Sequence, residues 1–174
     1  LSIGTFYGDT PADANTLLRK RKWGSFSGPR GPGFICPFAR CSECGNDMVW
    51  DEEDVKRGQE ILRCSQCELE LGPKLIRLTR SALLASPPDV LFTTTEMLNQ
   101  RMSSDKFRGL FGIGVSDSPQ IMLLDEVHTY DGVHGAQVGN LIRRWRHLSG
   151  AHPHFVGLSA TLADAVRFMA DLTG

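Results

Sequence analysis

Residues 121–128 constrain the fold more than any other stretch of this 174-residue chain. Four consecutive apolar residues, Ile-Met-Leu-Leu, are followed directly by Asp125 and Glu126. A short apolar run that ends abruptly in charged residues is typical of a strand buried in a parallel sheet. The two carboxylates are therefore expected at the carboxyl end of that strand, where open α/β sheets place their ligands.

Adjacent carboxylates in such a position suit the hydrolysis of a nucleotide. The first acid, Asp125, can hold Mg²⁺ directly or through water. The second acid, Glu126, can orient and deprotonate the attacking water. The competing interpretation is a fortuitous acid pair at the end of a strand.

Three ordered motifs resemble those of superfamily-two helicases. LLDEVH over residues 123–128 resembles motif II, the DExH form of the Walker B element. TTTEMLNQR over residues 93–101 is similar to the TTPEKL-type motif that touches the nucleic-acid backbone. FVGLSAT over residues 155–161 is similar to the strand and SAT sequence of motif III. The order and spacing of all three make a chance match to LLDE alone a poor explanation.

The resemblance assigns further residues to roles in this family. It implies that His128 links motif II to the loop of motif III, which couples hydrolysis to unwinding and comprises Ser159, Ala160 and Thr161. It also implies that the second motif contacts a phosphate backbone, through Thr94, Thr95 and Arg101. Hydroxyl groups at a helix start also serve as ordinary caps, and both roles can hold at once.

The resemblance predicts an α/β fold, a RecA-like parallel sheet with helices on both faces, interrupted by a small zinc-ribbon-like insert. Residues 1–22 and 75–174 would form a partial first helicase domain, and residues 23–74 the loop and insert. No GxxxxGK[ST] occurs in the sequence, so motifs I and Ia are expected upstream of residue 1. The chain alone is therefore expected to be inactive.

Four of the five cysteines form two CxxC pairs, Cys41 with Cys44 and Cys64 with Cys67. This spacing places four thiolates within reach of one structural Zn²⁺ ion. Cys36 is the spare; it could replace Cys41 as a ligand, but a plain buried thiol is the simpler interpretation. A redox role for the pairs is disfavoured because neither CxxC opens a helix after a strand.

Within the insert, the Gly- and Pro-rich residues 23–35 are predicted to form a loop. Residues 49–50 and 61–63 are predicted as the short ribbon strands, joined through a solvated acidic turn at residues 51–54. The basic residues 19–22, with Trp23 and Phe26 nearby, could clasp a phosphate backbone and stack on a base. Cations that complement the end of a helix explain the same basic residues equally well.

Outside the insert, the pattern predicts a strand at residues 2–7 and a helix from Thr10 to about Lys22. A second helix is expected over residues 134–148, with Val138, Trp145 and Leu148 on its apolar face. Its arginines could line a nucleic-acid path, but a solvated helix face is the commoner explanation.

The net charge of −1 argues against a protein that coats nucleic acid by bulk electrostatics. No apolar run is long enough to span a membrane, and no leader opens the chain, so a cytoplasmic location is expected.

The sequence thus predicts part of an ATP-dependent helicase. Its expected partners are ATP with Mg²⁺, nucleic acid with DNA favoured over RNA, and the remaining helicase domains. GDT, TTTEMLNQRM and DEVHTYDGVHGAQV look most like prokaryotic helicases with a DUF1998 module, including those of DISARM-type phage defence. The alternative is a non-catalytic zinc-ribbon module on a RecA-like scaffold, which binds nucleic acid or docks to a protein.

Overall fold

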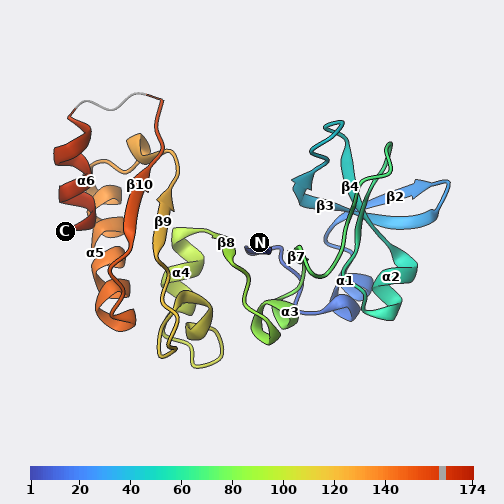
Figure 1. Cartoon of the computed structure of the whole chain (residues 1–174), viewed down its shortest axis with the longest axis horizontal. Coiled ribbons are helices and arrows are strands. Elements are labelled where there is room, and N and C mark those ends of the chain that lie inside the picture. The colour runs from blue at the N-terminus through green and yellow to red at the C-terminus, as the bar shows by residue number, and fades with distance from the viewer. Residues whose placement is uncertain (161–163) are drawn as a thin grey trace. The chain divides into compact units, whose positions relative to one another are not determined.

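The computed structural model describes residues 1–160 and 164–174 (Figure 1). The chain divides into two compact units, Leu1–Thr94 and Thr95–Gly174, and each is described by itself. Among the described residues, no helix is both long and apolar enough to cross a membrane.

The first unit contains a three-stranded parallel sheet in the order β7-β1-β8. Its strands are β1 (Ile3–Phe6), β7 (Ile76–Arg77) and β8 (Val90–Thr93). The Asp89 carboxylate accepts from the backbone N–H and the hydroxyl of Ser2, at 2.6 and 2.9 Å, and so ties the starts of β1 and β8 together. These two donors lower the pKa of Asp89. The strand predicted at residues 2–7 is confirmed by β1.

Helix α1 (Ala14–Lys20) begins later than the sequence pattern predicts. Its cap is Asp13, whose side chain accepts from the backbone N–H of Thr16 at 2.6 Å. Thr10 instead donates its hydroxyl to the carbonyl of Thr5 and accepts from the N–H of Tyr7, so it stabilises the turn before the helix. Helix α3 (Arg80–Ala85) lies between β7 and β8 in the chain and is capped by Thr79.

The first unit also contains a five-stranded antiparallel sheet in the order β2-β3-β4-β5-β6. Its strands are β2 (Gly24–Gly28), β3 (Gly31–Arg40), β4 (Asp47–Asp51), β5 (Leu62–Cys64) and β6 (Glu70–Leu71). The predicted ribbon strands are confirmed by β4 and β5. The loop predicted over residues 23–35 is wrong, because β2 and β3 pair there as a hairpin.

The solvated acidic turn predicted at residues 51–54 is also wrong. Helix α2 (Glu52–Arg57) occupies most of it, and Asp51 and Asp54 are buried. Arg63 on β5 pairs with both carboxylates, and its Nη1 lies 3.0 Å from Asp51 Oδ2. Buried charges require such a partner, because loss of hydration is costly.

The core around this sheet includes Trp23, Trp50, Cys41 and Cys64. Trp23 is buried and donates its indole N–H to the carbonyl of Asp9 at 3.2 Å. It therefore packs in the core, and the predicted stacking of this indole on a base is wrong for the described conformation.

The second unit contains a parallel pair of strands, β9 (Ile121–Leu124) and β10 (His154–Gly157). Its helices are α4 (Thr95–Arg101), α5 (Gly132–Ser149) and α6 (Ala165–Thr173), with short 3-10 turns η1 (Arg108–Phe111) and η2 (Val127–Thr129). Leu124 and Val127 pack against Val138 and Ile142 of α5 and Leu172 of α6, so these two helices cover one face of the pair (Figure 1).

Two expectations for this unit are corrected. Ile121 and Leu123 are 60% and 59% exposed, so β9 is buried on one face and not on both. Alternate residues of a strand point to opposite faces, and α5 and α6 cover the face of Leu124. Leu148, predicted on the apolar face of α5, is 43% exposed, whereas Val138 and Trp145 are buried as predicted. The chain is thus a mixed α/β protein with parallel sheets, compatible with a RecA-like fold.

Candidate functional site

The two acids lie at the carboxyl end of β9, directly after Leu124. The chains that leave β9 and β10 stay joined beyond the strands: Leu158 N–H donates to Leu124 O at 2.8 Å, and Val127 N–H donates to Leu158 O at 3.0 Å. These bonds fix the backbone on both sides of Asp125 and Glu126. Both acidic side chains are exposed and so accessible to a ligand.

Glu126 has a left-handed backbone, with φ 49° and ψ 43°. Its N–H donates to Asp125 Oδ1 at 2.9 Å, and its carbonyl accepts from the hydroxyl of Thr129 at 2.7 Å. Non-glycine residues rarely adopt this conformation, and it recurs at sites where the surrounding structure holds a side chain for function. This turn fixes the backbone that carries both carboxylates.

His128 lies between the acids and the loop that follows β10. Its Nδ1 is 3.2 Å from the hydroxyl oxygen of Ser159 and 3.3 Å from Glu126 Oε2. Three residues predicted for the site, from two segments 31 positions apart, are thus in contact. Ala160 follows Ser159 on the surface, whereas Thr161 lies outside the described residues.

Tyr130 is a nearby residue that sequence reasoning did not select. Partial burial raises the pKa of its phenol, and the negative charge of Asp125 raises it further. Its ring meets that of His134 edge-on, with centroids 5.6 Å apart. The only signal in the sequence was its position five residues after Asp125.

The three residues predicted to contact a nucleic-acid backbone lie at the two ends of helix α4. Thr94 directly precedes α4, Thr95 opens it, and Arg101 ends it. The guanidinium of Arg101 lies 5.5 Å from the ring centroid of Phe107, so this arginine is packed against an aromatic side chain and is half-buried. Thr95 lines a cavity between α4 and α5.

The four paired cysteines form one cluster in which all four sulfur atoms lie within 4.8 Å of one another. The Sγ atoms of Cys41 and Cys67 are 3.4 Å apart, and those of Cys44 and Cys64 are 3.3 Å apart. Four sulfurs at ~2.3 Å from a tetrahedral Zn²⁺ are separated by roughly 3.8 Å. The cluster is therefore close to the size of a zinc site, and its sulfurs are too far apart for disulfide bonds.

The polypeptide around the cluster favours a thiolate on Cys64. Burial opposes its ionisation, but the backbone N–H groups of Cys67 and Gln66, both 3.3 Å from Cys64 Sγ, lower its pKa to about 6. Hydrogen bonds with Cys41 and Cys64 raise the pKa of Cys67 to about 12 despite an opposing backbone N–H at Leu69. A lowered pKa at Cys64 suits a metal that needs deprotonated sulfur.

Cys36 lies outside this cluster. It is buried in the hydrophobic core, and burial raises its pKa to about 11. The four sulfurs that lie together therefore include Cys41 and not Cys36, which is the grouping that the paired spacing predicts.

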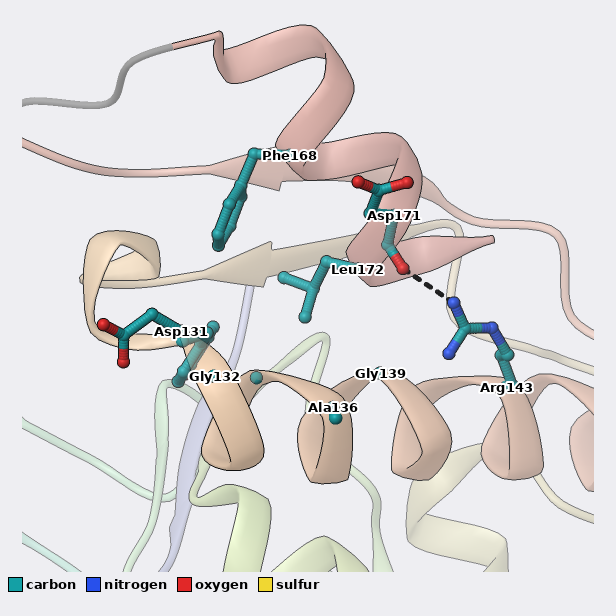
Figure 2. A pocket seen from close by; sticks show the side chains of 10 residues that line it. Asp131, Gly132, Ala136, Gly139, Arg143, Phe168, Asp171 and Leu172 are labelled. Carbon is teal, nitrogen blue, oxygen red and sulfur yellow. Dashed lines mark hydrogen bonds between the residues drawn. The ribbon is translucent and has the colours of Figure 1, made fainter.

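A cavity of about 350 Å³ lies between α5 and α6 (Figure 2). On α5 its wall is made of small residues, including Gly135, Ala136 and Gly139. Arg143 closes one end by donating from Nη2 to the carbonyl of Asp171 at 2.6 Å. A Cβ on Gly135 would lie 2.4 Å from the carbonyl oxygen of Tyr130. The first turn of α5 therefore approaches Tyr130 so closely that it requires glycine at position 135.

Comparisons with known proteins find partial relatives among helicases. The chain is 35% identical over 65 residues to the uncharacterized ATP-dependent helicase YprA of Bacillus subtilis, covering 36% of this chain. It is 27% identical over 100 residues to the ATP-dependent helicase hrq1 of Schizosaccharomyces pombe, covering 55% of this chain. The chain spans 9% of the length of each relative. No family model and no solved structure matches.

These matches support a helicase-related role in coarse outline. Neither name bears on phage defence, and the DUF1998 and superfamily-two placements stay predictions.

Proposed function

We propose that this chain is part of an ATP-dependent nucleic-acid helicase of superfamily two, and that it supplies the acids that hydrolyse ATP. The contact of His128 with both Glu126 and Ser159 is the observation that carries the proposal. A histidine that contacts both the candidate general base, Glu126, and the loop after β10 is suited to couple hydrolysis to movement of that loop. The partial similarity to two helicases supports the same assignment.

Each acid has a distinct role in this proposal. Asp125 offers hard carboxylate oxygens for the Mg²⁺ that accompanies ATP. Glu126 orients the attacking water and accepts its proton. His128 contacts both the Glu126 carboxylate and the hydroxyl of Ser159. A change at the nucleotide that moves Glu126 would therefore be passed through His128 to the loop of Ser159, Ala160 and Thr161.

Hydrolysis also needs groups that cradle the β- and γ-phosphates, because catalysis of phosphoryl transfer is almost entirely positioning and charge stabilisation. The chain contains no GxxxxGK[ST] sequence. We therefore expect the phosphate-binding loop and a second domain to come from other parts of the helicase. On this view the 174 residues alone do not turn over ATP.

The decisive measurement is steady-state ATP hydrolysis by the full-length protein that carries this chain, with and without single-stranded DNA or RNA. Glu126→Gln should lower the stimulated rate about a hundredfold or more, because it removes a general base and leaves the shape unchanged. ATP binding should persist. Glu68→Gln, at an exposed position of the other unit, is the matched control and should hydrolyse normally.

Two outcomes would contradict the proposal. A protein that binds a strand but never hydrolyses ATP would favour the alternative, a non-catalytic zinc-ribbon module. Turnover by the 174 residues alone that disappears in Glu126→Gln would show that their phosphate site lies elsewhere in this chain.

We also propose that Cys41, Cys44, Cys64 and Cys67 hold one structural Zn²⁺. The sulfur cluster supports this assignment because its size and its low-pKa thiol both suit the metal. Zinc bound there would join the turn before β4 to the turn after β5. The ion would stabilise the fold and take no part in hydrolysis.

A further inference from the structure

A polar groove between α4 and α5 has no role in the function proposed above. Its volume is about 610 Å³, within the range of ~300–1,000 Å³ typical of ligand cavities. Thr95 and Asn99 of α4 form one wall. Gln137, Asn140 and Arg144 of α5 form the other.

The groove combines polar walls with an apolar floor. Gln137, Asn140 and Arg144 are spaced by three and four residues, so they share one face of α5, and all three are exposed. Val138 and Leu141, which also line the groove, are buried. An apolar floor beneath side-chain amides is suited to a flat, polar-edged ring.

The two walls are held together by a side-chain bond. Arg144 Nη2 donates to Asn99 Oδ1, so α4 and α5 are joined across the groove. A guanidinium has five N–H donors, and this bond uses one of them. Arg144 can therefore keep the groove in shape and still donate to an anion.

The charges of the groove indicate which part of a nucleic acid it would accept. Glu96 lines the α4 wall, and Arg144 of α5 is the one arginine among the described residues that line the groove. A run of phosphates would be repelled by this carboxylate and would need several cations. Side-chain amides, in contrast, pair with the edges of bases, and a carboxylate accepts from an exocyclic amino group.

We infer that this groove holds one unpaired base of a single-stranded nucleic acid. The ring lies on Val138 and Leu141, its edge bonds to Gln137 and Asn140, and Arg144 donates to the adjoining phosphate. The inference rests on the proposed helicase function, because Thr95 at the start of α4 belongs both to this groove and to the predicted backbone contact.

The test is strand binding by the full-length protein without nucleotide, measured by fluorescence anisotropy with oligodeoxythymidylate, oligodeoxycytidylate and oligouridylate. Gln137→Ala with Asn140→Ala should weaken binding roughly 5- to 100-fold, the effect of losing base-edge hydrogen bonds. A 4-thiothymidine strand should photo-cross-link within residues 134–144 of the native protein. A blunt duplex of the same length should bind more weakly and be insensitive to the double substitution.

A second pair of variants separates binding from folding. Gln137→Glu with Asn140→Asp keeps the shape of both side chains and replaces their N–H donors with charge, so it should weaken binding at least as much. Arg144→Ala should weaken binding and reduce its salt dependence by about one counterion. His147→Ala on α5 and Arg167→Ala on α6, both outside the groove, are the matched controls and should bind normally.

Native affinity in both double variants, or cross-links confined to other segments, would overturn the inference. Because binding is measured without nucleotide, it does not depend on proton transfer by Glu126. A failure here is therefore distinguishable from a failure of the proposed ATP hydrolysis, which Glu126→Gln tests separately.

Discussion

Glu60 illustrates how a single buried residue organises its surroundings. It is 8% exposed, and its two carboxylate oxygens accept from different groups. The backbone N–H of Leu78 donates at 2.7 Å and the hydroxyl of Thr79 at 2.5 Å. Thr79 also caps α3 by accepting from the N–H of Ala82 at 3.1 Å. One carboxylate before β5 thereby fixes the cap of α3, which lies 19 residues later in the chain.

The stability of the chain should depend on pH through Glu60. Burial raises its pKa in the folded state, and the hydrogen bonds from Thr79 and Leu78 only partly offset this. A group whose pKa is raised by folding stabilises the protein below its unfolded pKa of about 4.3 and loses that contribution as pH rises through the folded value. The free energy of unfolding of the native protein relative to Glu60→Gln should therefore fall from acidic toward neutral pH.

Chemical denaturation across that pH range measures this difference. A difference for Glu60→Gln that instead grows as pH rises would mean that the hydrogen bonds outweigh burial.

At the scale of elements, some strands and helices of the five-stranded antiparallel sheet region could be predicted from the sequence and others could not. Strands β4 and β5 could be predicted because Val49, Trp50 and Leu62 are apolar residues adjacent to the cysteine pairs. The β2-β3 hairpin could not, because its ladder pairs residues such as Gly28 with Gly31, and backbone bonds leave no side-chain pattern. Helix α2 was hidden for another reason: the buried Asp54 is neutralised by Arg63, which lies nine residues later and outside the helix.

Metal content should distinguish the clustered cysteines from the spare one. Protein purified without added metal should contain about one zinc ion per chain. Cys64→Ser should lose most of it, because serine offers no thiolate, whereas Cys36→Ser should retain it. Elemental analysis of the three proteins checks this. Zinc retained in Cys64→Ser, or lost equally in both variants, would contradict the proposed ligand set.

At the scale of the whole molecule, the chain consists of two units with different sources of stability. The sulfur cluster and its surrounding core lie within Leu1–Thr94. The candidate acids, with a separate core that includes Leu124 and Val138, lie within Thr95–Gly174. The order Asp125, His128, Ser159 could be read from motifs, and so the contact of His128 with Ser159 was anticipated, whereas its contact with Glu126 was not. The exposed face of β9 was not, because an apolar run records hydrophobicity but not which face is covered.

A zinc chelator should consequently loosen one unit and spare the other. Hydrogen–deuterium exchange should quicken at amides of β4 and β5, whose turns carry the ligands, and stay unchanged in β9 and α5. Chelator already saturated with zinc is the control and should alter neither. Equal acceleration in both units, or none in the first, would contradict this division.

The left-handed backbone of Glu126 has a consequence for how this chain could be improved by selection. Glycine adopts that conformation freely, whereas a residue with a side chain bears a strain of about 1 kcal/mol or more. Replacement by glycine would relieve that strain and delete the proposed base in one step. A library of the full-length protein screened for heat resistance alone would therefore tend to lose the proposed base at this position, and only a screen that also demands ATP hydrolysis would keep the glutamate.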